Sequence, residues 1–363
     1  MLATFPSSCD GIMPPLPPQR VLAISPTSSL KTSPPNPLKC PATRFLPPLD
    51  FTMISKTTLA RKRLLVVGDS MLDRYWFGDT NRISPEAPVP VVRIVKNEDR
   101  LGGAANVALN IAELGASATL MSVIGNDDAG KSLQSLLAAA HIDDLSAVDN
   151  SVRTTVKLRV LARRQQLVRI DFEDHPAGEV LAALMATFEA KIADFDALVL
   201  SDYGKGGLDH IVHMIAAAKK AGVPVLIDPK GSDYSRYRGA TLITPNRAEL
   251  ALVVGNWTTE AELIEKAQNL RRKLDLTALL LTRSEEGMTL FTDKGEFNVP
   301  AQAREVFDVS GAGDTSIAVT AAMIAAGLDL KEAVRIANQA GGIVVGKLGT
   351  ASVTYEELFG KGN

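Results

Sequence analysis

The strongest constraint on the fold is the alternation of short apolar runs with segments of helical spacing. From Arg61 onward, apolar runs of strand length such as "RLLVVGD" and "DALVLSD" end at glycine or aspartate, and between them lie segments such as "GGAANVALNIAELG". Strands that read as continuous apolar runs are buried on both faces. The pattern therefore predicts an α/β fold with a mostly parallel central sheet and helices on both faces.

The polar residues that end these strands are the first candidates for a functional site. In open α/β sheets, ligands bind beyond the carboxyl ends of the strands. Side chains at those ends therefore face the place where a substrate would lie. The residues in question are Asp69, Asp202, Asp228, Asn246 and Arg283.

Two stretches break this rhythm and alternate apolar with polar residues, as half-exposed strands do. They are "APVPVVRIV" (87–95) and the segment 153–174, which is rich in arginine and valine. We expect a small separate β-layer, with lid segments at about 80–98 and 153–174, that forms a lid or the surface of a homodimer. An ordinary antiparallel edge of the main sheet is the alternative.

The first 55 residues differ in composition from the rest of the chain. Twelve of the 20 prolines and both cysteines, Cys9 and Cys40, lie within the first 50 residues. Such a stretch cannot bury enough surface to offset its ordering entropy, and it lacks the basic start and apolar run of a secretory signal. We expect 1–55 to be a disordered extension and 56–363 to be the folded domain. A natural start at Met53 and a Pro-rich ligand for a partner are the alternatives for the extension.

Bulk composition excludes several classes of function. The formal net charge is −2, so no basic excess points to nucleic acid. No apolar run reaches the roughly 18 residues of a membrane span. Because the chain after residue 50 has no cysteine, a disulfide framework is excluded there, and a reducing cytoplasm fits.

The stretch "GNDDAGKS", Gly125 to Ser132, matches the phosphate-loop pattern G-x-x-x-x-G-K-[ST] between an expected strand and an expected helix. A phosphate loop works because bare backbone N–H groups face a polyanion. Asp127 and Asp128 would repel such a polyanion, by roughly 4 kcal/mol per charge pair at about 4 Å. We therefore expect turn and cap residues here. The dinucleotide fingerprint is also absent after the first strand.

The stretch "DVSGAGDTSIA", Asp308 to Ala318, carries a different anion-binding pattern. Gly311, Ala312 and Gly313 let a ligand approach the backbone, and their N–H groups lie at a helix N-terminus, where the helix dipole favours anions. Asp314 adjoins these amides. An anion hole beside a carboxylate suits phosphoryl transfer, with the carboxylate taking the proton of the attacking hydroxyl. The alternative is that Asp314 is only the N-cap of the helix.

These motifs resemble the ribokinase-like (PfkB) family of sugar kinases. "DVSGAGD" fits the C-terminal signature of that family and "GGAANVA" the N-terminal one, and "GD" with Asp73 after the first strand and "NRAE" at 246–249 are also typical. The resemblance covers about residues 61–356. It implies a ribokinase-like fold and an enzyme that uses ATP and Mg²⁺ to phosphorylate an alcohol group of a sugar.

Four further stretches narrow the resemblance: "DRYWFGDTNRISPEAPVPVV", "LVLSDYGKGGL", "IDPKG" and "TRSEEGM". They imply a member that phosphorylates C1 of a heptose 7-phosphate, in ADP-heptose and lipopolysaccharide core synthesis. In many bacteria that domain is fused to a nucleotidyltransferase with an H-x-G-H motif. None of the four histidines forms this motif, so we expect a stand-alone kinase. A kinase for another sugar, or a non-catalytic sugar- or nucleotide-binding module, is the alternative.

The resemblance also implies roles for the site residues. Asp314 would be the base, with Gly311, Ala312 and Gly313 as the anion hole. The sugar hydroxyls would be held by Asp73, Gly102, Gly103 and Asn106. The alternatives are purely structural roles: a turn or helix cap for Asp73 and a helix-surface position for Asn106.

On the nucleotide side the implied residues are Asn246, Arg247, Ala248, Glu249, Thr282, Arg283, Gly287 and Asn338, with Glu249 reaching Mg²⁺ through water. Arg283 is a candidate phosphate contact. N-x-x-E also fits a helix capping box, and Asn338 also fits a buried polar residue that is satisfied within the fold. Some relatives bind a monovalent cation such as K⁺ at the positions of Asp308, Ser310 and Gly349.

A phosphosugar substrate needs a cationic anchor, because it already carries one phosphate. Arginine can bind phosphate in a bidentate way, and lysine can bind it as a point charge. The sequence cannot choose among the basic candidates, each of which could equally be a solvated surface charge. They are Arg82, Lys157, Arg159, Arg163, Arg164, Arg169 and Lys230.

Overall fold

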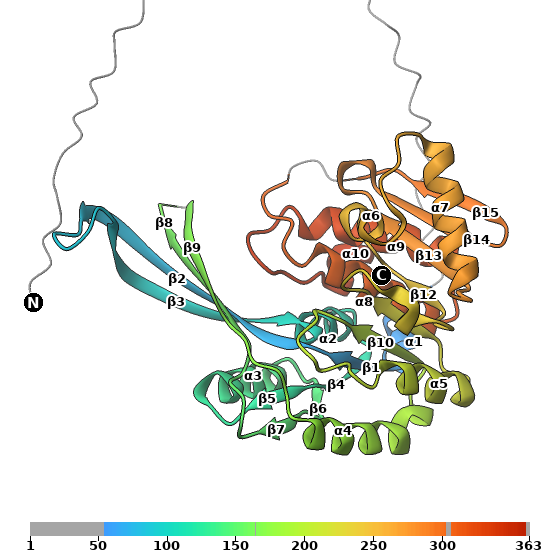
Figure 1. The fold of residues 1–363 in the computed structure, drawn as a ribbon, viewed down its shortest axis with the longest axis horizontal. Coiled ribbons are helices and arrows are strands. Elements are labelled where there is room, and N and C mark those ends of the chain that lie inside the picture. Colours follow the sequence, from blue (N-terminus) through green and yellow to red (C-terminus); the bar gives the residue numbers. More distant parts are fainter. Residues whose placement is uncertain (1–53, 164, 303–305, 361–363) are drawn as a thin grey trace, which may run out of the picture. The chain divides into compact units, whose positions relative to one another are not determined.

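A computed structural model describes residues 54–163, 165–302 and 306–360. In these residues the main sheet has nine strands in the order β15-β14-β13-β12-β11-β10-β1-β4-β6. All neighbouring pairs are parallel except β13–β14 and β14–β15. The predicted mostly parallel sheet is therefore confirmed (Figure 1). The strands are β1 (Arg63–Gly68), β4 (Ser117–Met121), β6 (Asp143–Asp144), β10 (Ala197–Ser201), β11 (Val225–Asp228), β12 (Leu242–Ile243), β13 (Ala278–Thr282), β14 (Met288–Thr292) and β15 (Gly295–Val299).

Helices cover both faces of this sheet, because successive side chains of a buried strand point to opposite sides. Leu64 and Val66 of β1 belong to one apolar cluster, whereas Leu65 and Val67 belong to another. The first cluster contains residues of α1 (Lys56–Leu59), α2 (Ala104–Glu113), α3 (Asp128–Ala139), α8 (Ala312–Ala325), α9 (Leu330–Val344) and α10 (Tyr355–Phe359). The second contains residues of α4 (Gly178–Lys191), α5 (Ile211–Ala221), α6 (Arg247–Val254) and α7 (Glu260–Lys273), with the short 3₁₀ turns η2 (Ile192–Asp194) and η3 (Tyr234–Tyr237). A third 3₁₀ turn, η4 (Ser284–Glu286), follows β13.

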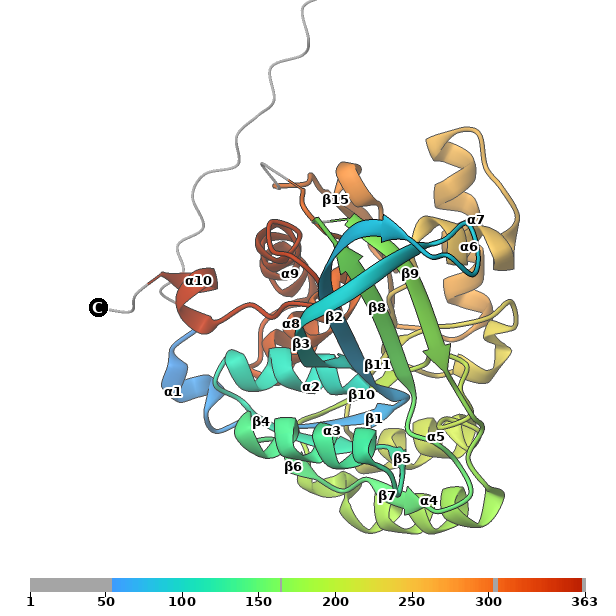
Figure 2. The same ribbon diagram turned by 90° about the vertical axis from the view of Figure 1, so that its left-hand side faces the viewer.

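A second sheet, which we call the lid sheet, has the order β3-β2-β8-β9. Its strands are β2 (Ser70–Ile83), β3 (Pro90–Gly103), β8 (Val156–Ala162) and β9 (Gln165–Phe172). It projects from the end of β1 away from the helices of the main sheet (Figures 1 and 2). It is thus a separate layer and not an edge of the main sheet. A small third sheet pairs β5 (Val123–Gly125) with β7 (Ala147–Asp149).

The limits expected for the first lid segment were too narrow at both ends. We placed the first segment at about 80–98, but β2 begins at Ser70, directly after β1, and β3 continues to Gly103. The reason is that the pairing of β2 with β8 joins residues more than 80 positions apart, such as Asp73 and Lys157. A strand held by such distant pairing gives a weak local signal.

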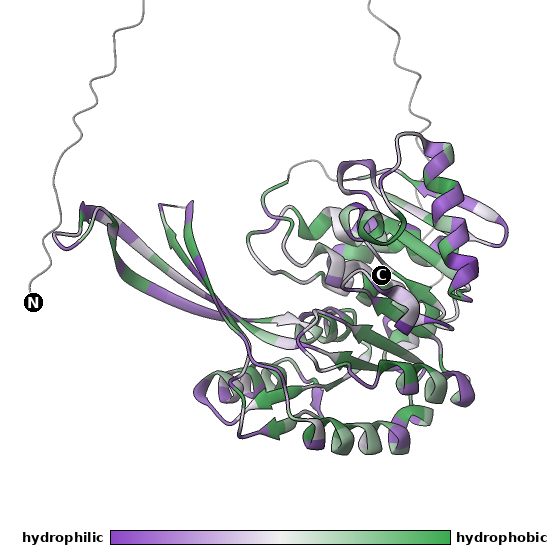
Figure 3. Cartoon of the chain, viewed as in Figure 1, coloured by the Kyte–Doolittle hydropathy of each residue, from purple (hydrophilic) through white to green (hydrophobic). Residues whose placement is uncertain are grey.

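The two faces of the lid sheet differ in polarity. Paired neighbours in adjacent strands share a face, so Asp73 and Lys157 lie on one side together with Arg159 and Asp171. The opposite side carries exposed apolar residues (the apolar lid face): Trp76, Val168, Ile170 and Phe172. Figure 3 shows this mixture along the lid strands, in contrast to the hydrophobic central strands.

The loop that matches the phosphate-binding pattern is filled by its own aspartate. Asp127 is the N-cap of α3, and its Oδ1 accepts a hydrogen bond from Gly130 N at 2.7 Å. Its Oδ2 accepts another from Thr154 N at 2.9 Å. Lys131 is exposed and lies 3.5 Å from Asp128. The turn-and-cap interpretation is therefore confirmed, and the loop has no free cradle for a phosphate.

The expected N-terminal boundary needs a correction of two residues. Ile54 is buried, and its carbonyl accepts a hydrogen bond from the Tyr355 hydroxyl at 2.9 Å. Ser55 caps α1 through its side chain. Both residues therefore belong to the fold, although we placed 1–55 in the extension. The expectations for residues 1–53 lie outside the described residues. Among the described helices, none is long and apolar enough to cross a membrane.

Candidate active site

The site is built around the N-terminus of α8, a helix that is buried on almost every side. Its N-cap, Gly311, has φ +81°, in the left-handed region that favours glycine. A Cβ at Gly311 would come within 3.0 Å of Asn106 Nδ2, whereas one at Gly313 would meet nothing within 4 Å. The chain therefore needs glycine at the first position for packing, and it leaves the second open towards a ligand.

The amides of this helix end are available to an anion, with one exception. Ala312 N donates to Val309 O at 3.3 Å, so this N–H of the predicted anion hole is partly used within the loop. The N–H groups of Gly311, Gly313 and Asp314 have no backbone acceptor among the described residues. These three amides are therefore the ones left free for an anion at this helix end.

Asp314 is only 3% exposed, and both oxygens of its carboxylate are held by side chains from elsewhere in the chain. Asn106 Nδ2 donates to Oδ2 at 2.8 Å, and the Tyr203 hydroxyl donates to Oδ1 at 2.7 Å. Asp314 is not the cap of α8, because the cap is Gly311 and no side chain caps that end. The N-cap alternative is therefore wrong.

Burial raises the pKa of Asp314 to about 6, whereas the hydrogen bonds from Asn106 and Tyr203 lower it. Asp73 raises it further and Lys157 opposes that effect. A carboxylate with a pKa near 6 is mostly ionised at neutral pH and is still basic enough to accept a proton. This environment suits a general base.

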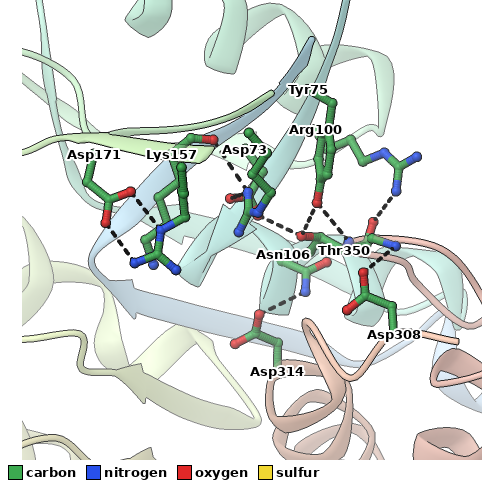
Figure 4. A network of polar contacts seen from close by, with 12 residues as sticks. Asp73, Tyr75, Arg100, Asn106, Lys157, Asp171, Asp308, Asp314 and Thr350 are labelled. Carbon is green, nitrogen blue, oxygen red and sulfur yellow. Dashed lines mark hydrogen bonds and ion pairs between the residues drawn. The ribbon is translucent and has the colours of Figure 1, made fainter. Parts of the chain in front are cut away.

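The predicted sugar-binding residues lie together beside Asp314 (Figure 4). Asp73 is buried inside β2; Arg159 Nη1 donates to its Oδ1 at 2.6 Å and Thr350 Oγ1 to its Oδ2 at 2.7 Å. A Cβ at Gly102 would lie 2.6 Å from Asp73 Oδ2, so only glycine fits there. Asn106 is fully buried in α2. The cap alternative for Asp73 and the surface alternative for Asn106 are both wrong.

A cavity of about 220 Å³ lies on the other side of Asp314. Among the predicted nucleotide residues it is lined by Asn246, Glu249 and Thr282. Asn246 and Glu249 also form a complete capping box at the start of α6, and Lys230 Nζ lies 3.0 Å from Glu249. The remaining lining residues are Asp202, Tyr203, Asp228, Pro229, Lys230, Thr244, Gly311, Gly313 and Asp314.

Two predicted nucleotide contacts, Arg283 and Arg247, are bonded to other side chains. The buried Arg283 guanidinium is bonded to Glu260, Glu286 and Thr289, so it is not free for the phosphate contact that we expected. Arg247 pairs with Glu286 as well. Ala248 lies on the first turn of α6, between Arg247 and Glu249. Among the described residues, these three do not line the cavity.

Gly287 and Asn338 also have structural explanations. A Cβ at Gly287 would lie 2.1 Å from Val299 O, so its glycine is required by the close approach of β15. Asn338 is buried and its Nδ2 donates to Pro300 O at 2.8 Å, which matches the alternative of a satisfied buried polar residue.

The residues of the expected cation site lie together. Asp308 Oδ1 accepts a hydrogen bond from Ser310 N, and Oδ2 accepts one from Gly349 N, each at 2.9 Å. Oδ1 therefore closes a turn within the loop before α8, and Oδ2 joins this loop to the loop at Gly349.

Two contributors to the site were not predicted by role. Tyr203 stands in "LVLSDYGKGGL" directly after β10, and its position beyond a strand end was the available signal. Asp228 ends β11 and lines the cavity; burial, with the charges of Asp314 and Glu249, raises its pKa well above the usual range. Asp228 was among the strand-end candidates, but without a role.

No cluster of three or more His, Cys, Asp or Glu ligands exists in the described part of the chain. A divalent ion here would therefore need oxygen ligands from a substrate or from water. Mg²⁺ binds in this way, because it keeps several waters and joins one or two carboxylates to substrate phosphates. Asp228 and Glu249 fit such a role.

A mostly parallel α/β sheet, a lid with a polar inner face and a buried carboxylate beside free helix amides are together typical of a kinase of small molecules. The chain belongs to the pfkB family of carbohydrate kinases, which matches residues 61–357.

The chain is similar to curated members of two kinds. It is 57% identical over 303 residues to D-beta-D-heptose 7-phosphate kinase of Bordetella bronchiseptica, covering 84% of this chain and 97% of that relative. It is 54% identical over 300 residues to the bifunctional protein HldE of Actinobacillus pleuropneumoniae, covering 82% of this chain and 62% of that relative. The chain thus spans less than two thirds of the bifunctional protein.

Solved structures show the same fold at low sequence identity. Phosphofructokinase-2 from Escherichia coli in complex with potassium aligns with a TM-score of 0.68 and 22% identity, over 82% of this chain and 98% of that one. Arabidopsis thaliana ribokinase complexed with ribose and ATP aligns with a TM-score of 0.65 and 20% identity, over 82% and 97%. The ribokinase-like fold is therefore confirmed.

Replacing Asp314 with asparagine tests the assignment of the base. Asparagine keeps the shape of the side chain but cannot accept the hydroxyl proton, so kcat should fall by at least about 100-fold. In the wild type, kcat/KM should fall as the pH drops below about 6, because the base becomes protonated. Retention of more than about a tenth of wild-type kcat would contradict the assignment.

The melting temperature provides the control for this variant. Folding raises the pKa of Asp314, so the folded state binds its proton more tightly than the unfolded state does. The contribution of Asp314 to stability is therefore fully present below the ordinary aspartate pKa and is lost as the pH rises through about 6. The variant should therefore melt no lower than the wild type at pH 8. A lower melting temperature there would indicate a structural role instead.

Proposed function

We propose that this protein is an ATP-dependent kinase that phosphorylates the C1 hydroxyl of D-glycero-β-D-manno-heptose 7-phosphate, giving the 1,7-bisphosphate. The observation that carries the proposal is the buried Asp314 carboxylate beside the free amides of Gly311 and Gly313. The substrate is supported by the relative named D-beta-D-heptose 7-phosphate kinase, 97% of which is covered at 57% identity. We also propose that the reaction takes place in the cytoplasm, as a step of ADP-heptose synthesis.

The chemistry follows from the position of the base. Asp314 takes the proton of the C1 hydroxyl, O1 forms a bond to the γ-phosphorus, and the bond from that phosphorus to the β,γ-bridging oxygen breaks, so that its electron pair leaves with ADP. Charge on the transferring group is met by the N–H groups of Gly311, Gly313 and Asp314. Preorganised donors of this kind are usually the largest single contribution to catalysis.

The cavity beside Asp314 suits the nucleotide phosphates and Mg²⁺. Glu249 and Asp228 line it and would hold the ion, Glu249 through water. When bound, Mg²⁺ neutralises phosphate charge. Lys230, 3.0 Å from Glu249, adds a positive charge on the same side. Lys230 is therefore better placed for the nucleotide than for the sugar phosphate.

Distance along the lid strands removes two candidates for the sugar-phosphate anchor. Arg82 lies nine residues beyond Asp73 on β2, which is about 30 Å at 3.3 Å per residue. Arg163 lies six residues beyond Lys157, or about 20 Å. Both are exposed and too far from the base. Arg164 lies outside the described residues.

Among the rest, Lys157 is the best anchor. Arg159 is paired with Asp73 at 2.6 Å, and Arg169 with Asp171 at 2.9 Å. Lys157 Nζ lies 5.2 Å from the centre of the Tyr203 ring, and no ion pair is formed by it among the described residues. Burial lowers the pKa of Lys157, and Arg169 and Arg159 add to this effect. A bound phosphate would offset both the burial of the Lys157 charge and its repulsion by the two arginines.

The apolar lid face fits a second copy of this chain. Trp76, Val168, Ile170 and Phe172 are each exposed by 36% to 46%, and they lie on one side of the lid sheet. Contiguous apolar patches of this kind mark interaction surfaces. We therefore include in the proposal a homodimer formed through the lid sheets.

The activity is tested by ATP turnover on a panel of phosphorylated and free sugars, with the position of the new phosphate read by NMR. The heptose 7-phosphate should give the highest kcat/KM, with the new phosphate on C1, and turnover should be lost in EDTA. Higher kcat/KM on another sugar phosphate would favour a different substrate in the same family. No turnover on any sugar would favour a binding module.

Changing Lys157 to glutamine tests the anchor. Loss of a hydrogen bond to a charged group costs about 1.5–3 kcal/mol, so KM for the phosphosugar should rise about 10- to 100-fold, with KM for ATP unchanged. Arg169→Gln is the matched control, because Arg169 lies on the same face but is already paired with Asp171. An unchanged KM in Lys157→Gln with a raised one in Arg169→Gln would reassign the anchor.

Changing Ile170 to aspartate tests the dimer. A charge in a buried interface is costly, so sedimentation velocity should show the wild type as a dimer and the variant as a monomer. Val212→Asp is the control, because Val212 is 56% exposed on α5, outside the lid sheet. The lid interface would be rejected if Ile170→Asp sediments like the wild type.

A further inference from the structure

Tyr203 lies in a loop whose backbone is held by hydrogen bonds to Asp69. Asp69 Oδ2 accepts hydrogen bonds from Tyr203 N and Lys205 N, and its Oδ1 accepts one from Gly207 N, each at 2.9 Å. Gly103, with φ +58°, is required by the nearby backbone, since a Cβ there would lie 2.5 Å from Asp69 O. The buried Asp69 carboxylate therefore holds the backbone of the loop that carries Tyr203.

The Tyr203 hydroxyl and Asn106 each donate a hydrogen bond to a different oxygen of the Asp314 carboxylate. Tyr203 donates to Oδ1 at 2.7 Å and Asn106 Nδ2 donates to Oδ2 at 2.8 Å. A carboxylate offers about four acceptor sites, so two donors stop its rotation and still leave positions for a substrate hydroxyl. Without the tyrosine hydroxyl, one oxygen would lose its partner.

The ring of Tyr203 also touches the lid sheet. Lys157 Nζ of β8 lies 5.2 Å from the ring centre, within the range of a cation–π interaction. Tyr203 lines the nucleotide cavity as well. It therefore lies where the lid sheet, the base and the nucleotide side meet.

The charged and polar groups around Asp314 come from every element packed against it. They are Asp73 of β2, Asn106 of α2, Lys157 of β8, Tyr203 after β10 and Asp228 of β11. Of these, Tyr203 and Asn106 donate hydrogen bonds to the carboxylate. Burial and the charges of Asp314 and Asp228 raise the pKa of Tyr203 well above the usual range, so the phenol stays protonated and remains a donor.

We propose that Tyr203 is a positioning residue for the reaction: its hydroxyl fixes the orientation of the Asp314 carboxylate and favours its ionised form. This inference rests on the proposed function, in which Asp314 is the base. A hydrogen bond to the charged form of a carboxylate favours that form. Tyr203 therefore keeps a buried base available near neutral pH, at a place where burial and Asp73 act in the opposite direction.

The test is a pH titration of the Tyr203→Phe variant. Phenylalanine keeps the ring and its contact with Lys157 but removes the hydroxyl. The acid limb of kcat/KM should move up by about one pH unit, given the strength of a hydrogen bond to a charged group. With the wild-type pKa at about 6, the loss of kcat/KM at pH 6 should be about fivefold larger than at pH 9.

A second measurement needs no substrate. The carboxyl carbon of Asp314, labelled with ¹³C and assigned by comparison with Asp314→Asn, should titrate at higher pH in Tyr203→Phe than in the wild type. This NMR readout stands even if the sugar assignment fails, so the two failures can be told apart.

Tyr237→Phe is the matched control. Tyr237 is fully buried and its hydroxyl donates to Asp202 at 2.8 Å, not to Asp314. It should leave both the acid limb and the Asp314 titration in place. Equal titration of Asp314 in the wild type and in Tyr203→Phe would overturn the proposal, as would a loss of kcat/KM that is the same at pH 6 and pH 9.

Discussion

The site depends on holding one carboxylate where water barely reaches. Asp314 lies in the first turn of α8, a helix buried on nearly all sides, and burial alone would favour the protonated acid. Asn106 and Tyr203 offset part of that cost with two hydrogen bonds. These donors come from α2 and from the loop after β10. The packing of those elements against α8 is therefore a condition for having an ionised base at all.

Residues of the lid sheet lie directly beside Asp314, so the position of the lid and the surroundings of this carboxylate are coupled. β2 leaves the end of β1 and carries Asp73 into the site, where Arg159 of β8 and Thr350 bind its two oxygens. β3 returns to α2 through Gly102 and Gly103, and the absence of side chains there makes room for the Asp73 carboxylate and for the Asp69 carbonyl. A shift of the lid strands would thus change the surroundings of the base.

The charge of the cavity agrees with the proposed use of a metal ion and of free amides. Asp228, Glu249 and Asp314 line it, and Lys230 is the cation among the described lining residues. A nucleotide polyphosphate would be repelled by such a surface. Mg²⁺ bound to the phosphates, with Lys230 and the N–H groups at the start of α8, would reverse the sign of that interaction. Burial, together with the charges of Asp314 and Glu249, raises the pKa of Asp228 well above its usual range.

The sequence by itself determined the parts of this protein that follow from local rules. Apolar periodicity predicted the parallel sheet and its covering helices, and the glycines before Asp314 predicted the start of a helix there. Charge predicted that "GNDDAGKS" is no phosphate loop. Residue types such as these report backbone conformation and burial within a few positions, so they can be interpreted without a fold.

Only the tertiary structure decided which side chains meet. Asp314 is bonded to residues 208 and 111 positions away, Asn106 and Tyr203, and no local pattern encodes such pairs. The same reason explains β2, which is held by a strand more than 80 residues later. Arg283 and Lys157 are both basic in the sequence, but the fold surrounds Arg283 with Glu260 and Glu286 and leaves Lys157 facing the site. The function of a basic side chain depends on whether acidic side chains pair with it, and only the folded chain brings those residues together.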